Sequence, residues 1–198
     1  MKIDTKDILN SILDSLSRID YIKPENVPDI DLYMDQVTTF MNAELSSSKR
    51  YQEDKILTKT MINNYAKNHL LPPPVKKKYS REHMLLLIFI YYFKNILSIG
   101  DIQALLEPIT EKYFKSQEGF DLTNLYNEVF RLEKGQIEVL KENIRQNWET
   151  AQGTFADAPQ EDQEFLKQFS FICLLSFDVY LKKQVIEKLI DELPKKGK

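Results

Sequence analysis

The stretch of sequence that decides the fold runs from residue 58 to residue 106 and reads TKTMINNYAKNHLLPPPVKKKYSREHMLLLIFIYYFKNILSIGDIQALL. Proline removes a backbone donor and biases the preceding residue away from the helical region, so we expect a helix over residues 58–68 that ends before the three prolines. Ser80 is the expected N-cap of the next helix, with His83 in the capping-box position. This helix runs to about Leu97 and is apolar on almost all sides, which predicts that it forms the centre of the core.

Further helices are predicted before and after this stretch. Apolar residues at helical spacing indicate a helix over residues 6–19, and two prolines within residues 21–29 indicate a connector. Asp31 is expected to cap the next helix. The apolar stripe of that helix is Leu32, Val37, Phe40, Met41 and Leu45. A short amphipathic helix over residues 98–106 is expected to end before Pro108. Its buried stripe is expected to be Ile99, Ile102, Leu105 and Leu106.

The C-terminal part of the chain has the pattern of long helices. Asp121 is expected to cap a helix of about 28 residues, followed by a loop at residues 153–159 and a helix over residues 161–193. Because no strand of convincing length is found, the predicted fold class is all-α, with at most a two-stranded wing near residues 75–79. The predicted regions are an N-terminal helix and connector, a central domain that includes the wing, and a C-terminal helical domain. They cover residues 1–28, 29–109 and 110–198.

The net charge of −3 hides an uneven distribution along the chain. Residues 49–94 contain ten lysines and arginines against three acidic residues, so this segment has a charge of +7 and the remainder has −10. A basic segment in an acidic chain is a candidate anion-binding surface. A local excess of lysine is by itself a weak signal.

The single cysteine and the hydropathy pattern suggest where the protein works. Cys173 lies in an apolar run, so we expect it to be a small buried hydrophobic residue, with a reactive thiol as the alternative. One cysteine cannot form a disulfide within the chain, which favours a reducing, cytoplasmic setting. The N-terminus lacks the apolar core of a secretory signal, and the longest apolar run, residues 84–93, is too short to cross a membrane.

Residues suited to catalysis are scarce. The chain has two histidines, His69 and His83, and no zinc-ligand spacing. Its five glycines are never clustered, so a phosphate-binding glycine loop is not expected. Asp178 lies in an apolar segment, where we expect a hydrogen-bonded helix residue rather than a general acid. The sequence therefore predicts a protein that is not an enzyme and that needs no metal or other cofactor.

The helix over residues 58–68 has a polar face suited to reading DNA. Met61, Ile62 and Tyr65 are expected to face the core. The opposite face is expected to contact DNA and consists of Lys59, Thr60, Asn63, Asn64 and Lys67. Asparagine can pair with adenine through two hydrogen bonds, and lysine reaches guanine or phosphate. The alternative is an ordinary solvated helix face.

A cluster of positive charge follows the prolines. The expected phosphate-binding residues of this segment are Lys76, Lys77, Lys78, Tyr79 and Arg81. Four cations on a short segment between two helices are well placed to neutralise several phosphates, and such binding weakens steeply as salt rises. The alternative is a solvated basic turn.

The order of these features resembles the winged helix-turn-helix domain of MerR-type regulators over about 50 residues. The matching features are the helix ending in Leu70-Leu71-Pro72, the wing tyrosine Tyr79 and a last helix that opens with Ser98 and carries Leu105 and Leu106. Two positions depart from the family pattern. Asn63 stands where the family has a phosphate-binding arginine, and His69 stands where it has a glycine, so His69 must adopt a left-handed conformation. The whole chain also resembles an uncharacterised bacterial family known only as a domain of unknown function.

The resemblance implies a DNA-binding transcriptional regulator that contacts double-stranded DNA through a helix-turn-helix and a basic wing. It also implies a homodimer through the C-terminal helices, because a twofold dimer presents two recognition helices to two half-sites. Packing of these helices within one chain is the alternative. The other function that fits is an interaction module, in which the basic domain binds an acidic protein or RNA. Nothing in the sequence identifies an effector ligand.

Overall fold

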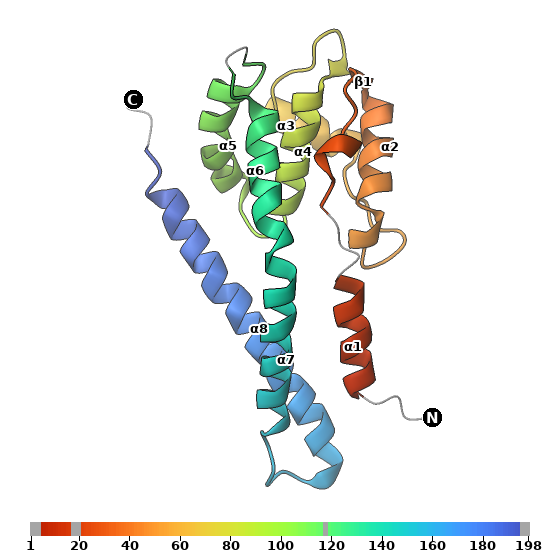
Figure 1. Cartoon of the computed structure of the whole chain (residues 1–198), viewed down its shortest axis with the longest axis vertical. Helices are drawn as coiled ribbons and strands as arrows, with labels where there is room; N and C mark the ends of the chain where they lie inside the picture. Colours follow the sequence, from red (N-terminus) through yellow and green to blue (C-terminus); the bar gives the residue numbers. More distant parts are fainter. Residues whose placement is uncertain (1–4, 17–20, 117–118, 195–198) are drawn as a thin grey trace. The chain divides into compact units, whose positions relative to one another are not determined.

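The computed structural model describes residues 5–16, 21–116 and 119–194, and these form an all-α fold with one small antiparallel sheet (Figure 1). The helices are α1 (Thr5–Leu16), α2 (Met34–Glu44), α3 (Lys59–Lys67), α4 (Arg81–Phe93), α5 (Ile99–Tyr113), α6 (Leu122–Lys134), α7 (Gln136–Gln152) and α8 (Gln160–Asp191). The strands are β1 (Leu32–Tyr33) and β2 (Lys78–Tyr79), and the short 3-10 helices are η1 (Pro24–Asn26) and η2 (Ser46–Ser48). The chain divides into two compact units, Met1–Leu132 and Glu133–Pro194.

The core of the first unit is built around α4. Nine consecutive residues of this helix, 83–91, are buried, as its apolar sequence predicts. A helix whose sides are all covered needs packing partners in every direction. Buried side chains of α1, α2, α3 and α5, including Leu13, Met41, Ile62 and Ile102, supply apolar surface to the same unit.

His83 closes the N-terminus of α4 and lies in the core. The Ser80 backbone N–H donates to Nδ1 of His83 at 2.9 Å, so the predicted capping box is confirmed with histidine in place of glutamate. The imidazole ring is 1% exposed and meets the rings of Tyr79 and Phe114 edge-on, with centroid distances of 5.5 and 4.8 Å. Burial lowers the pKa of His83 below its ordinary value, because the charged imidazolium is poorly solvated there.

This burial predicts a loss of stability in mild acid. Since the pKa of His83 is lower in the folded than in the unfolded chain, protonation below a pH of about 6.5 favours unfolding, by up to about 1.4 kcal/mol per pH unit. Urea unfolding measured from pH 8 to pH 5.5 is expected to show this decrease. His83→Gln retains a side-chain acceptor for the cap and is expected to flatten the curve. An unchanged slope in this variant would contradict the assignment.

The predicted start of α2 at Asp31 is wrong. Leu32 and Tyr33 form β1 and pair with Tyr79 and Lys78 of β2, and the helix begins after Tyr33. Val37, Met41 and Leu45 are buried as expected, whereas Leu32 is buried through the sheet rather than through the helix. The partner strand lies more than forty residues away in the sequence, so helical periodicity alone does not reveal the pairing.

The C-terminus of α3 has the left-handed residue that the sequence requires. His69 has a φ of 59°, its backbone N–H donates to the carbonyl of Ala66 at 3.3 Å, and that of Leu70 donates to the carbonyl of Tyr65 at 2.9 Å. These two bonds form a Schellman motif, in which the left-handed position usually holds glycine. The helix therefore ends before the prolines, as predicted.

Two further boundaries differ from the prediction. Helix α5 continues through Pro108 to Tyr113 instead of ending before the proline, and Ile99 of its predicted apolar stripe is exposed. The predicted helix of about 28 residues after Asp121 is divided into α6 and α7 at Gly135. The predicted helix over residues 6–19 agrees with α1 up to Leu16, and its last three residues lie outside the described residues.

The second unit is a pair of helices, α7 and α8, joined at the predicted loop. Phe171 of α8 is buried and meets Trp148 of α7 edge-on at 5.2 Å. The expected burial of Cys173 is wrong, because its side chain is exposed on α8. Asp178 forms a surface ion pair with Lys182 at 2.7 Å, in agreement with a hydrogen-bonded helix residue.

Candidate nucleic-acid interface

The polar face of α3 is exposed. Thr58 caps this helix by accepting a hydrogen bond from the Met61 backbone N–H at 3.2 Å, and Ile62 and Tyr65 are buried. The five residues of α3 that were predicted to contact DNA are all exposed: Lys59, Thr60, Asn63, Asn64 and Lys67. The structure therefore places the short polar side chains together on one face that is open to a ligand.

Most side chains on this face are available for contact. Among the described residues, the side chains of Thr60, Asn63 and Asn64 make no hydrogen bond with another part of the protein. Lys59 forms an ion pair with Asp35 of α2, and both side chains are well exposed, at 60% and 75%. An ion pair this exposed contributes little to stability, so a phosphate can replace the carboxylate at low cost.

Lys76 and Lys77 form a tight two-residue turn that leads into β2. The backbone N–H of Lys78 donates to the carbonyl of Val75 at 2.9 Å, and the N–H of Val75 donates to the carbonyl of Lys78 at 3.0 Å. The φ angles of Lys76 and Lys77 are 49° and 65°, as in a type I′ turn. Asparagine and glycine are the usual residues in such a turn, because a side chain at positive φ costs energy. Both lysines are exposed.

Two residues predicted to bind phosphate have structural roles instead. Tyr79 is only 3% exposed and packs against His83, so it cannot reach DNA in this conformation. The guanidinium of Arg81 donates to the backbone carbonyls of Val27 and Pro24, both at 2.7 Å, and so ties the connector to the start of α4. Lys78 is half-buried, with its ammonium 5.2 Å from the centre of the Tyr33 ring.

One helix supports the whole surface. Helix α2 contacts α3, β1 and β2, so the exposed face of α3 and the strand that follows the lysine turn share a rigid support.

The long segment between α2 and α3 is held to α4 by two contacts that the sequence did not reveal. Lys94 donates to the carbonyl of Ile56 at 2.7 Å, and the hydroxyl groups of Ser48 and Tyr91 lie 2.5 Å apart. Lys94 is half-buried, and burial lowers its pKa; its ammonium is engaged by Ile56 and by the ring of Tyr91, so it adds little to the basic surface.

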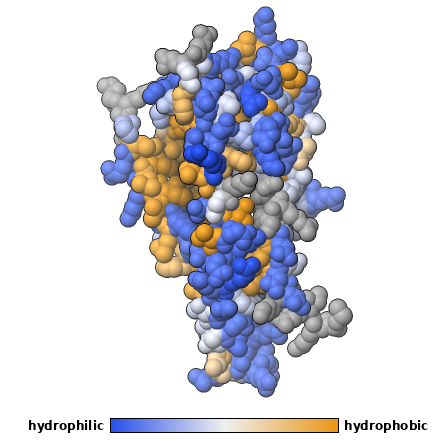
Figure 2. Space-filling view, viewed as in Figure 1, coloured by the Kyte–Doolittle hydropathy of each residue, from blue (hydrophilic) through white to orange (hydrophobic). Residues whose placement is uncertain are grey.

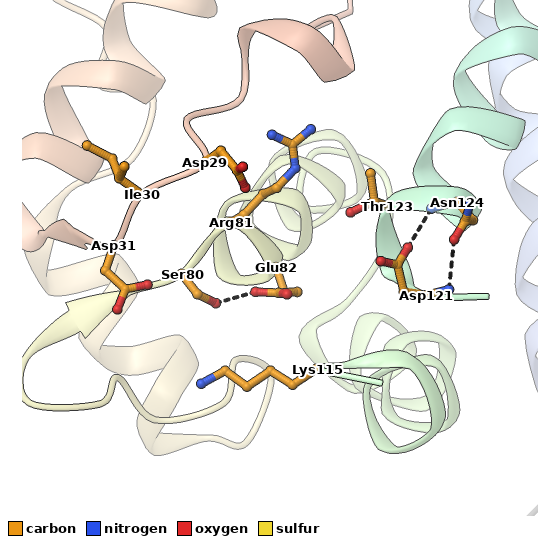
Figure 3. Close-up of a pocket in the computed structure, with 10 residues that line it drawn as sticks. All are labelled: Asp29, Ile30, Asp31, Ser80, Arg81, Glu82, Lys115, Asp121, Thr123 and Asn124. Atoms are coloured by element: carbon orange, nitrogen blue, oxygen red, sulfur yellow. Dashed lines mark hydrogen bonds between the residues drawn. The ribbon is translucent and has the colours of Figure 1, made fainter. Parts of the chain in front are cut away.

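A cleft of about 790 Å³ is lined by the segment before β1, the start of α4 and the start of α6 (Figure 3). The lining residues are Asp29, Ile30, Asp31, Ser80, Arg81, Glu82, Lys115, Asp121, Thr123 and Asn124. Carboxylates outnumber cations in this lining, and the hydrogen bond from Ser80 Oγ to Glu82, at 2.5 Å, lies within it. Because repulsion would oppose a phosphate here, the candidate interface is confined to α3 and the lysine turn.

Neither a metal centre nor a membrane segment is found in the described part of the chain. Over residues 5–16, 21–116 and 119–194, no group of three or more histidine, cysteine or acidic side chains is arranged to hold a metal ion. In the same ranges, no helix is long and apolar enough to span a bilayer.

These features define the class of the molecule: an all-α protein whose first unit carries a small sheet and a basic surface. A family model described as a domain of unknown function, DUF1836, matches residues 22–129, which is more than half of the chain. The chain belongs to this family. The matched residues include α2, α3, the lysine turn, α4 and α5, so the candidate interface lies within the family domain. Comparison with curated proteins gave no match, and comparison with solved structures gave none.

Proposed function

We propose that this protein is a DNA-binding transcriptional regulator whose first unit acts as a winged helix-turn-helix similar to that of MerR-type regulators. In this proposal α2 is the support helix, α3 is the recognition helix and the Lys76–Lys77 turn is the wing. The observation that carries the proposal is the turn itself, in which two exposed lysines occupy strained backbone positions and lead into β2, which packs on the same helix, α2, as the polar helix α3. Strain of this kind is concentrated at functional sites.

The two parts of the surface have different tasks. Asn63 and Asn64 have the donor and acceptor groups that pair with adenine in the major groove, and Thr60 offers a hydroxyl and a methyl group. Lys76, Lys77 and Lys78 hold phosphates and supply affinity without sequence preference. Lys59 and Lys67 lie at the two ends of α3, where they contact phosphate or guanine. We further propose a cytoplasmic homodimer that uses the C-terminal helices and places two recognition helices on two half-sites.

The proposal is tested by titrating random-sequence duplex DNA with the full-length protein. Fluorescence anisotropy at several salt concentrations is expected to show micromolar or tighter binding at low salt that weakens steeply as salt rises. Duplex RNA of the same length serves as the comparison. Binding that is absent at low salt contradicts the proposal, and equal or tighter binding of RNA would favour the interaction module instead.

If α3 reads bases and the lysine turn holds phosphates, Asn64→Ala should change sequence preference but not overall affinity for DNA. This change removes a base-reading amide and no charge, so affinity for random DNA is expected to stay within about twofold, while discrimination among selected sequences falls by about 1–3 kcal/mol at one base pair. Selection from a random oligonucleotide pool, performed with the wild type and the variant, measures this difference. Identical selected motifs would show that Asn64 does not read a base.

A further inference from the structure

The long helix α8 exposes much apolar surface. Phe165, Phe169, Ile172, Val179 and Tyr180 are each between 52% and 67% exposed, although α8 packs on α7 along its other side. Figure 2 shows hydrophobic surface where the C-terminal half of α8 runs in Figure 1. We refer to these five residues as the outer face of α8. Apolar patches of this size mark interaction surfaces rather than ordinary solvent-exposed faces.

The area of this surface is at the low end of what a specific dimer requires. The five residues of the outer face are each more than half exposed and together offer on the order of 500 Å². Two copies that cover each other's outer face therefore bury on the order of 1,000 Å² in total, which is the lower bound for a specific interface.

The charges along α8 favour a second copy of the same helix in the opposite direction. Residues 168–177 contain no charged residue, and they occupy the middle of the helix. The section before it has Glu161, Asp162 and Glu164 against Lys167, a net charge of −2, whereas the section from residue 178 to residue 191 has three lysines and three acidic residues and is neutral. An antiparallel pair keeps the two acidic ends apart, whereas a parallel pair in register brings them together.

We propose that two copies of this protein associate through the outer faces of their α8 helices, antiparallel and centred near the middle of the helix. The proposal specifies the surface of the homodimer on which the proposed function depends for reading two half-sites. A twofold axis suits this surface, because the same patch on both copies is self-complementary.

The oligomeric state in solution tests the surface. Sedimentation velocity of the wild type without DNA is expected to show a dimer at micromolar concentration. The double variant Phe169→Glu, Ile172→Glu is expected to be monomeric or to dissociate at least 100-fold more readily, because burying two carboxylates is unfavourable. Ile99→Glu changes a similarly exposed residue of the first unit and is expected to remain dimeric. A monomeric wild type, or a double variant as dimeric as the wild type, would overturn the proposal.

Thiol cross-linking of the native chain tests the register without any risk of misfolding. Cys173 is exposed and lies close to the midpoint of α8, so in the proposed pair the two Cys173 residues are about 8 Å apart along the helix axis. A bismaleimide with an arm of similar length is expected to convert the wild type into covalent dimers. Pairing through only the C-terminal halves of α8 would separate these thiols by more than about 25 Å and give no product.

A second cysteine position tests the direction of the helices. In a Cys173→Ser background, Glu164→Cys is expected to give no cross-link, because antiparallel packing separates residues 164 by about 35 Å along the axis. A cross-link at this position would show parallel packing and overturn the antiparallel assignment. Both measurements omit DNA, so a failure here leaves the salt-dependent DNA titration as a separate test of the proposed function.

Discussion

Replacing Lys76, Lys77 and Lys78 together by alanine is expected to lower the affinity for duplex DNA of every sequence by on the order of 10²-fold near 0.1 M salt. Each lysine that neutralises a phosphate releases about one counterion, so the slope of log affinity against log salt should become shallower by about 1 per lysine removed. Anisotropy titrations of the wild type and the variant over a range of salt concentrations measure both quantities.

The design of this variant separates charge from stability. Alanine has a Cβ as lysine does, so the strain of the two left-handed positions is retained and the turn keeps its backbone preference. Lys23→Ala, Lys112→Ala, Lys167→Ala removes the same amount of charge from other helices and loops, and this triple variant is expected to bind within a fewfold of the wild type. Equal loss in both variants would show that net charge, and not the turn, controls binding.

Arg81→Ala is expected to lower the free energy of unfolding by about 3 kcal/mol or more. The guanidinium donates two charge-assisted hydrogen bonds, to the carbonyls of Val27 and Pro24, and each such bond contributes about 1.5–3 kcal/mol. Removing the side chain also leaves both carbonyls without this donor. Urea unfolding followed by circular dichroism measures the loss.

Two comparisons make the role of Arg81 specific. Arg81→Lys is not expected to restore stability, because one ammonium does not reproduce the fork geometry that meets two carbonyls. Arg131→Ala removes an arginine from a surface ion pair, where the side chain is 75% exposed, and is expected to cost less than about 1 kcal/mol. At a temperature where the variant is fully folded, Arg81→Ala should retain its affinity for DNA. A large loss of DNA affinity under these conditions would show that Arg81 contacts DNA.

Much of the first unit could be predicted from local chemistry. The apolar run of α4, the cap at Ser80 and the prolines after α3 each act within a few residues, so their structural effects follow from the sequence. The left-handed conformation of His69 was also predictable, because it lies where a helix must end and no glycine is available.

The errors concern interactions between residues far apart in the chain. Asp31 has the side chain of an N-cap, but pairing of Leu32 with Tyr79 places the neighbouring residues in a strand. Pro108 usually ends a helix, yet α5 continues to Tyr113 and the next residue, Phe114, packs against His83. Tertiary contact decides in both cases, and periodicity within one segment contains no information about it.

In the candidate interface, too, local features were predictable from the sequence and long-range contacts were not. Exposure of the polar face of α3 follows from the helical spacing of Ile62 and Tyr65, and the structure confirms it. The role of Arg81 does not follow, because a cation beside three lysines suggests phosphate binding until the two carbonyls from residues more than fifty positions earlier are seen. Cys173 was predicted to be buried but is exposed. An apolar segment of sequence indicates that something covers it, but it does not show whether the covering surface belongs to the same chain.

The lysine turn before β2 is a locally frustrated element. The residue types that relax a turn with two positive φ angles, asparagine and glycine, carry no charge, whereas the residue type that supplies charge keeps the backbone strained. Exchanging Lys76 and Lys77 for Asn and Gly would therefore stabilise the turn. The same exchange would remove the two positive charges with which the turn attracts a polyanion. In this turn, foldability and electrostatic recognition make opposite demands on the same two residues.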